Sequence, residues 1–456
     1  MSPVAVVLNP SRAAAEVDDG RGKARAALRG TKGQRAVVVQ SGARDAYQLA
    51  LALSERDMLE MLVTDLFWPL DQGWARSLLR MLPRSVRSMI LLRSERRLPW
   101  RSIKLCWPSG LRTLLLEKFA KASLDTRRQA MRQADAVLGQ TAGSFAKQRN
   151  VGLVSYSYYG YDAFSAYGKA GILFQLHPHP ESMRKILSAE LSAHPDCADS
   201  LSQEWELSLP DEDFQHLVQE TRMAAYFLVA SSFTKATLIE NGARSSTISV
   251  IPYGVDTGRF RPNPNLRSKT NGRLRLLFVG RINQRKGIKY LLEALSLVNR
   301  NEIELTVCGR VVDGLELFGP FSDCVQVRPS VSADELVAAY QTADLFVFPS
   351  VAEGFGQVLL ESLACGLPIL STTHTAAPDL IEEGVQGFVV EPRRPDLLAG
   401  KIIWALEHRS ELAQMGQAAR SRAEEFTWER FRSKVADSVE EFLIQQTPSK
   451  SGWHDV

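Results

Sequence analysis

Two glutamates flank a short glycine loop in the stretch FVFPSVAEGFGQVLLESLACGLP, which runs from Phe346 to Pro368. Glu353 directly precedes the loop, and Glu361 follows eight positions later, inside a helix that the sequence predicts from Gln357 to Cys365. At ~1.5 Å rise per residue, Glu361 lies roughly 7 Å along that helix from the loop, about the distance from a diphosphate to the ribose that carries it. We therefore expect Glu361 to accept hydrogen bonds from ribose hydroxyls and Glu353 to contact another hydroxyl-rich group, with a sugar as the natural candidate.

The elements around this loop predict a phosphate site. The apolar run from Leu345 to Phe348 is typical of a strand that is buried on both faces of a parallel sheet. Gly354 and Gly356, on either side of Phe355, allow the backbone to approach a ligand closely. The first N–H groups of the helix lie at the positive end of its dipole and can bind a phosphate without a cationic side chain. These groups belong to Gly356, Gln357 and Val358. The alternative is an ordinary strand-loop-helix unit whose two glutamates are solvated surface residues.

A second strand end carries two cations. The apolar strand predicted from Leu274 to Val279 ends in the loop VGRINQRKG, in which Gly280 precedes Arg281 and Lys286. A helix predicted from Ile288 to Val298 follows, so the two cations project from the carboxyl edge of a parallel sheet, where such sheets bind their ligands. The planar fork of an arginine and the point charge of a lysine suit a diphosphate that departs as a leaving group.

The order Arg281-x4-Lys286 followed by Glu353-x7-Glu361, in the context EGFGQVLLESLACGLPIL, resembles the retaining glycosyltransferases of family 4, which have the GT-B architecture. The likeness covers roughly the last half of the chain, from VASSFTKATLIENGARSSTISVIPYGVDTGRF at 229–260 to FTWERF at 426–431. The resemblance implies an α/β fold of two Rossmann-like, doubly wound parallel-sheet domains that face a central cleft. It also implies transfer of a sugar from a nucleoside diphosphate sugar to an acceptor, with retained anomeric configuration and without a metal or other cofactor.

The resemblance assigns roles to particular residues. The residues that it places against the sugar donor are Gly280, Arg281, Lys286, Glu353, Gly354, Phe355, Gly356, Gln357, Val358 and Glu361. The catalytic residues that it implies are His177, Glu353, Arg281 and Lys286. His177 is chosen because it directly follows a strand predicted from Ile172 to Leu176, the place where family members carry a histidine near the transferred sugar. The nearby His179 is the second choice and a candidate for acceptor contact.

Two further residues are candidates for acceptor contact. Gly42 follows the first predicted strand, Ala36 to Val39, and stands alone where many family members have a pair of glycines. Tyr158 lies in the tyrosine-rich loop after another predicted strand, and tyrosines at a strand end suit sugar stacking and hydroxyl recognition.

The chain is expected to comprise five segments. These are an N-terminal extension (1–34), a Rossmann-like acceptor domain (35–254), a linker (255–272), a Rossmann-like donor domain (273–425) and a C-terminal helix that crosses back to the first domain (426–456). Proline and asparagine residues in the linker argue against regular structure there. Within the acceptor domain, Ala134 to Leu138 and Val151 to Ser155 are interpreted as strands.

Composition excludes several other classes of protein. The 456 residues carry a formal net charge of +4, which is small for this length and gives no nucleic-acid-binding footprint. The five cysteines are scattered without CxxC spacing, so we expect reduced thiols and no zinc site. Val4 to Leu8 is too short for the core of a signal peptide, and no apolar stretch reaches the ~20 residues of a membrane span. We expect a cytoplasmic protein that is soluble or peripheral at the inner face of the membrane.

Positive charge is concentrated between residues 73 and 132. Fifteen arginines and lysines face three acidic residues there, with Trp74, Trp100 and Trp107 among them. Such a mixture can lie in an anionic lipid interface or bind an acidic acceptor, so residues 74–132 are a candidate membrane surface. The alternative is a set of amphipathic core helices with a basic outer face.

Two other functions stay open. An epimerase or hydrolase of nucleotide sugars on the same frame would need an acid and a base beside the sugar. A non-catalytic nucleotide-sugar-binding subunit would bind the donor and regulate a partner. The acceptor that the transferase hypothesis requires is a glycan, a lipid-linked molecule or a small molecule, used in polysaccharide or glycoconjugate biosynthesis.

Overall fold

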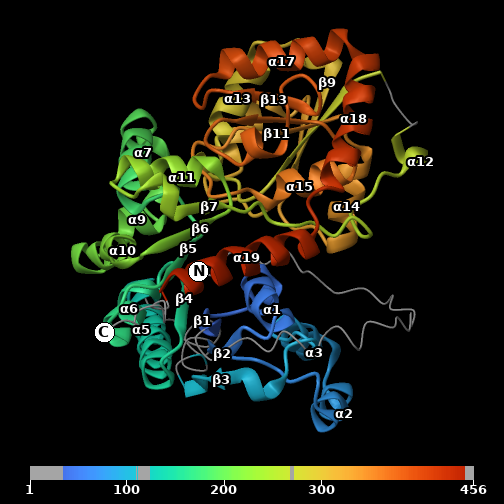
Figure 1. Ribbon diagram of the computed structural model, residues 1–456. Coiled ribbons are helices and arrows are strands. Elements are labelled where there is room, and N and C mark those ends of the chain that lie inside the picture. The colour runs from blue at the N-terminus through green and yellow to red at the C-terminus, as the bar shows by residue number, and fades with distance from the viewer. Residues whose placement is uncertain (1–33, 109, 111–123, 268–271, 447–456) are drawn as a thin grey trace, which may run out of the picture. The chain divides into compact units, whose positions relative to one another are not determined.

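The structure, a computed structural model, describes most of the chain (Figure 1). The described residues are 34–108, 110, 124–267 and 272–446. All of the predicted extension except Gln34 lies outside them, and so do the basic residues Arg112, Lys118 and Lys121.

Two parallel sheets organise the chain. The first has seven strands in the order β3-β2-β1-β4-β5-β6-β7, and the second has six in the order β10-β9-β8-β11-β12-β13. The strands of the first sheet are β1 (Ala36–Val39), β2 (Leu59–Thr64), β3 (Ile103–Leu105), β4 (Gly152–Tyr156), β5 (Ile172–Gln175), β6 (Tyr226–Val229) and β7 (Ile248–Val250). Those of the second are β8 (Leu274–Val279), β9 (Ile303–Cys308), β10 (Val325–Arg328), β11 (Leu345–Phe348), β12 (Ile369–Thr372) and β13 (Gly387–Val390). Pairing is parallel throughout the second sheet and from β3 to β5 in the first. The predicted fold class, two Rossmann-like doubly wound sheets, is confirmed.

The central strands have the sequences that burial on both faces demands. β1 reads AVVV and β11 reads LFVF, and every residue of both strands is buried. Helices cover the two sheets because each parallel connection must return along a face of its sheet. These helices are α1 (Gln48–Glu55), α2 (Gly73–Met81), α3 (Arg84–Leu91), α5 (Leu124–Arg149), α6 (Gly160–Tyr167), α7 (Pro180–Ala193), α8 (Ala198–Leu201), α9 (Trp205–Ser208), α10 (Asp211–Met223), α11 (Ser232–Glu240), α12 (Pro264–Arg267), α13 (Ile288–Ser296), α14 (Ala333–Thr342), α15 (Gln357–Ala364), α16 (Ala377–Leu380), α17 (Pro395–Glu407), α18 (Arg409–Ala423) and α19 (Trp428–Gln446).

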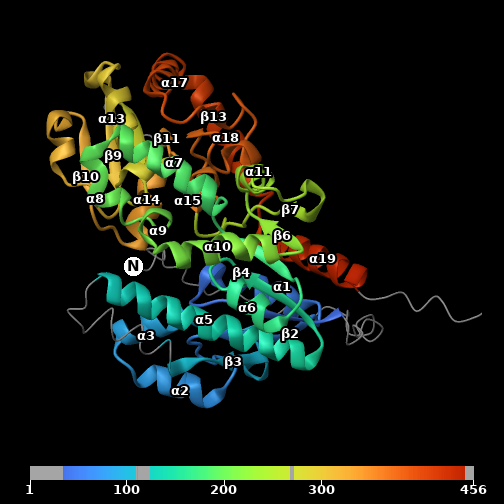
Figure 2. The same ribbon diagram turned by 90° about the vertical axis from the view of Figure 1, so that its left-hand side faces the viewer.

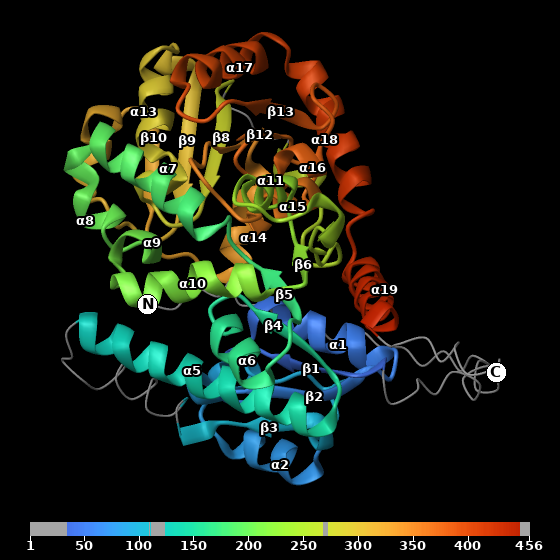
Figure 3. The same ribbon diagram turned by 60° about the vertical axis from the view of Figure 1, so that its left-hand side comes forward.

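By their contacts, the residues fall into two compact units. The first unit comprises the chain up to Phe174, 219–228 and the residues from Arg432 onward, and the second comprises 175–218 and 229–431. This grouping differs from the predicted boundary at residue 254, because α7 and α8 contact the short 3₁₀ helix after β8 (Figure 3). The five predicted segments stay a prediction, and the one-turn helix α12 lies inside the predicted linker.

One predicted strand is wrong. Ala134 to Leu138 lies inside α5, a helix of 26 residues. A short, mostly apolar segment does not distinguish a strand from part of a helix, and here the helix extends well beyond the segment on both sides. Gly139 and Gly143 let α6 lie directly against α5 (Figure 2), since a Cβ atom at Gly143 would stand 2.1 Å from the backbone oxygen of Ala163.

The described residues contain all five cysteines, each buried and without a disulfide. None of the helices in the described ranges is both long and apolar enough to cross a membrane. Within the same ranges, no group of three or more His, Cys, Asp or Glu side chains is arranged to hold a metal ion.

Candidate functional site

The loop between β11 and α15 joins a buried strand to a helix that begins at a glycine. Gly356 has φ 85° and begins the eight-residue helix α15, a left-handed conformation that glycine adopts without strain. The first N–H groups of α15 have no intrahelical partners, which leaves them available to an anion. The same loop carries Phe355, only 4% exposed, whose ring lies edge-on to that of Tyr253 at 5.0 Å.

Gly354 holds this loop against two other segments of the same chain, the start of α11 and the residues after β5. Its carbonyl oxygen accepts hydrogen bonds from Ser231 Oγ at 2.6 Å and from Thr234 Oγ1 at 3.2 Å. A Cβ atom at this position would lie 1.9 Å from the carbonyl oxygen of Leu176 and 3.1 Å from the Cα of His177. Only glycine therefore fits, and the structure places His177 beside the loop that carries Glu353.

The loop after β8 is the second component of the site. Its residues Gln284–Lys286 form a 3₁₀ turn that the side chain of Asn283 caps by accepting from Lys286 N. Gly287 ends the turn with φ 74°, and a Cβ atom there would lie 2.0 Å from the carbonyl oxygen of Pro349. Glycine thus lets this loop lie directly against the end of β11.

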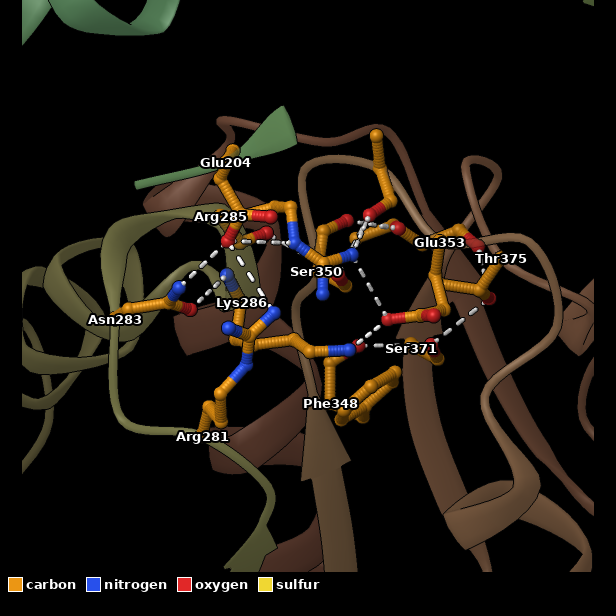
Figure 4. Close-up of polar contacts among 12 residues, drawn as sticks. Glu204, Arg281, Asn283, Arg285, Lys286, Phe348, Ser350, Glu353, Ser371 and Thr375 are labelled. Atoms are coloured by element: carbon orange, nitrogen blue, oxygen red, sulfur yellow. Dashed lines mark hydrogen bonds and ion pairs between the residues drawn. The ribbon is translucent and has the colours of Figure 1, made fainter. Parts of the chain in front are cut away.

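Three cations and two carboxylates meet between these loops (Figure 4). Glu353 forms ion pairs with Lys286 and, at 3.3 Å, with Arg285 Nη1. Glu204 lies 3.1 Å from Arg285 Nε and 3.5 Å from Arg281 Nη2. Of the predicted site residues, Lys286 is paired with Glu353, and Arg281 lies at the same cluster through its pair with Glu204. Their roles in catalysis stay predictions.

Burial and crowding control the charge of Lys286. Burial lowers the pKa of its amino group well below the usual value, and repulsion from Arg285 and Arg281 lowers it further against the attraction of Glu204. The amino group also stands 5.1 Å above the ring of Phe348. A bound anion would favour the charged form of Lys286, so this lysine is suited to respond to a phosphate.

Glu361 is more enclosed than the sequence indicated. Its side chain is 1% exposed, and Oε2 accepts a hydrogen bond from Tyr340 Oη at 3.0 Å. Burial raises the pKa of its carboxyl group to about 7, while the Tyr340 hydroxyl and Arg259 act in the opposite direction. The contact of Glu361 with a ribose stays a prediction. In the structure, the carboxyl group of Glu361 is hydrogen-bonded to Tyr340.

The remaining predicted residues fall at different places. His179 is 3% exposed and caps α7, since its Nδ1 accepts from Glu181 N at 3.2 Å. Gly42 and Tyr158 belong to the first unit, where both have positive φ, 66° and 82°. The N–H of Gly42 donates to Asp65 Oδ1 at 2.8 Å, which holds the loop after β1 in place.

Sequence reasoning missed several residues of the cluster. Arg285 could have been found, because it stands next to Lys286 in the same loop. Glu204 could not, because it is 77 positions away from Arg281 and carries no local motif. The same holds for Glu190, which is fully buried and accepts from Gln284 Nε2 at 2.7 Å and from Arg393 Nε at 2.6 Å.

Part of the chain is similar to known proteins. Residues 263–422 match the family described as Glycosyl transferases group 1, so the second unit carries a domain of that kind, including both loops of the cluster. Among curated proteins, the chain is 30% identical over 217 residues to a D-inositol 3-phosphate glycosyltransferase of Paenarthrobacter aurescens (strain TC1), covering 44% of this chain and 53% of the relative. It is 29% identical over 238 residues to a GDP-mannose-dependent alpha-(1-6)-phosphatidylinositol monomannoside mannosyltransferase of Mycobacterium tuberculosis (strain CDC 1551 / Oshkosh), covering 45% and 59%. The chain thus spans a little over half the length of these relatives.

Solved structures share the fold over most of the chain. Sucrose-phosphate synthase from Thermosynechococcus elongatus has a TM-score of 0.61 at 16% identity and covers 91% of this chain and 100% of that one. Anabaena Alr3699/HepE in complex with UDP-glucose has a TM-score of 0.56 at 17% identity and covers 89% and 99%. The chain therefore has the GT-B fold of glycosyltransferases.

Proposed function

We propose that the protein is a retaining glycosyltransferase of family 4, which transfers a sugar from a nucleoside diphosphate sugar to an acceptor. The observation that carries this proposal is the cluster of Arg281, Arg285 and Lys286 at the strand end beside the N-terminus of α15. The names of two similar proteins support a nucleoside diphosphate sugar as the donor. One curated relative is GDP-mannose-dependent, and one solved structure with the same fold is a complex with UDP-glucose.

The cluster suits the step in which the sugar leaves the diphosphate. Negative charge develops on the departing diphosphate, and pre-placed cations and backbone N–H groups stabilise such charge most effectively away from water. Arg281, Lys286 and the start of α15 supply these groups, so the proposed reaction needs no metal ion. Glu353, paired with Lys286, and the adjacent His177 are the residues that we assign to the sugar.

For the acceptor we propose a lipid-linked molecule held at an anionic membrane. The observation behind this is the outer face of α2, where Trp74, Leu78 and Met81 are 59, 44 and 81% exposed, and Arg80 of the same helix is also exposed. A row of exposed large apolar side chains on one helix face, with a cation on another side of the same helix, fits a lipid interface. The relative that acts on a phosphatidylinositol monomannoside is consistent with such an acceptor.

Thermal-shift screening against UDP-, GDP- and ADP-sugars tests the proposal. A donor present at ~100 times its dissociation constant should stabilise the fold by about 2.7 kcal/mol. Lys286→Ala should abolish both this shift and sugar transfer, because a point charge beside the diphosphate is lost. Donor turnover without any acceptor would indicate a hydrolase or epimerase instead, and a donor shift without turnover would indicate a binding subunit.

A further inference from the structure

Glu204 belongs to neither of the two loops, but its side chain lies within the cation cluster. It lies at the start of α9, between α8 and α9, and its side chain makes no cap hydrogen bond to that helix. Instead, its Oε1 accepts from Asn283 Nδ2 at 3.0 Å and forms the ion pairs with Arg281 and Arg285 (Figure 4).

The protonation state of Glu204 fits this position. Burial would raise the pKa of its carboxyl group, but the charges of Arg285, Arg281 and Lys286 outweigh burial and lower the pKa below its usual value. Glu204 is therefore ionised at neutral pH. It presents a carboxylate to the N–H groups of the two arginines that an incoming diphosphate would need.

The net charge of the cluster depends on Glu204. Lys286 is paired with Glu353, so Arg281 and Arg285 supply two positive charges against the one negative charge of Glu204 within ion-pair distance. With Glu204 in place, little net charge remains to attract a polyanion. Without it, two positive charges are uncompensated.

The contacts that hold the preceding helix α7 to the loop after β8 do not involve Glu204. Glu190, on the preceding helix α7, is held by Gln284 and Arg393 through two short hydrogen bonds and has no exposed surface. Glu204 itself lies in the short connection between two four-residue helices. A side-chain rotation or a local shift of that connection would free the arginines without breaking these contacts of α7.

We propose that Glu204 is an internal competitor that occupies the diphosphate subsite until a polyanionic ligand displaces it. This inference rests on the proposed function, since it assigns the diphosphate to this cluster. The inference predicts that the carboxylate of Glu204 lowers the affinity of the protein for phosphates. Ligands with little negative charge would then not displace it.

The test is calorimetric titration of the full chain with inorganic pyrophosphate, UDP and GDP in metal-free buffer. Glu204→Gln keeps the shape and the hydrogen-bond acceptor but removes the charge, and we expect pyrophosphate to bind about tenfold more tightly than to the wild type. The control is Asp196→Asn, on the same segment, which removes a carboxylate paired with Lys289 at the start of α13. It should bind pyrophosphate as the wild type does. Thermal melting of each variant checks that it is folded.

The outcomes separate this inference from the proposed function. If pyrophosphate binds the wild type but binds Glu204→Gln equally or more weakly, the carboxylate is not a competitor and the inference is wrong, while the diphosphate site stands. An equal gain in Asp196→Asn would also overturn it, since the effect would then be general electrostatics. If none of the three ligands binds either the wild type or Glu204→Gln, the proposed function fails together with the inference.

Discussion

Arg285 differs from Arg281 and Lys286 in holding both carboxylates of the cluster at once. Its Nη1 lies 3.3 Å from Glu353 and its Nε lies 3.1 Å from Glu204, and Nη1 also donates to Ala352 O at 3.0 Å. The contact between Arg285 Nε and Glu204 is an ion pair. Arg285 thus ties the loop after β8 to the loop after β11, whichever anion occupies the subsite.

Glu361 gives a prediction for pH dependence. Burial raises the pKa of its carboxyl group from 4.5 to about 7 in the folded state. Between these two pH values the folded chain binds more protons than the unfolded chain, so the free energy of unfolding falls as the pH rises through this window. We expect a fall of about 3 kcal/mol from this group, measured by urea unfolding at a series of pH values.

The matched variants for this measurement are Glu361→Gln and Glu407→Gln. Glu361→Gln cannot ionise and still accepts from Tyr340, so the fall attributable to this position should disappear. Glu407 is exposed on α17, and its substitution should leave the wild-type profile unchanged. Identical profiles for all three proteins would show that the carboxyl group of Glu361 titrates as it does in the unfolded chain.

At the scale of elements, the sequence was most informative where a strand, a loop and a helix follow one another. β11, its glycine loop and α15 lie where they were predicted, and Ser332 and Glu335 form a capping box at the start of α14. These features are local, because each depends on residues a few positions apart. The predicted strand inside α5 was wrong because a five-residue segment that is mostly apolar is compatible with either element. The pairing of Glu204 with the β8 loop has no local signal at all.

The exposed face of α2 predicts binding to anionic vesicles. In sedimentation with phosphatidylglycerol vesicles, we expect the protein to pellet at low salt and to be released as salt shortens the Debye length. Trp74→Ser combined with Met81→Ser should weaken this binding, because both side chains are largely exposed on α2. Leu297→Ser is the control, since this leucine is 58% exposed at the end of α13. Equal binding to neutral phosphatidylcholine vesicles, or no effect of salt, would contradict the membrane surface.

At the scale of the whole molecule, the chain passes between its two units four times. The last passage lies within α19, whose residues from Arg432 onward belong to the first unit. There α19 buries its apolar face, and Phe442 lies 5.7 Å from the ring of Tyr226. A unit assembled from the beginning and the end of the chain depends on contacts between residues nearly four hundred positions apart, so its stability cannot be read from any one stretch of sequence.

Two arginines, one on α19 and one just after α1, connect these two elements but differ in burial. Together they give a matched test of how much the contacts of α19 stabilise the first unit. Arg432, on α19, is 5% exposed and donates to Glu55 Oε2 at 2.8 Å and to the buried Gln48 Oε1 at 2.7 Å. Arg56, just after α1, pairs with Asp437 of α19 at 2.7 Å, but its side chain is 43% exposed.

Removal of the buried arginine should cost much more than removal of the exposed one. Arg432→Ala leaves the oxygen of Gln48 without its donor inside the packing, and we expect the free energy of unfolding to fall by about 2 kcal/mol. Arg56→Ala breaks a solvent-screened pair, for which we expect a loss below about 1 kcal/mol. Urea unfolding of both variants measures the difference. Equal losses would mean that α19 is held to the first unit by its apolar face alone, because the buried polar contacts of Arg432 would then contribute no more than a surface ion pair.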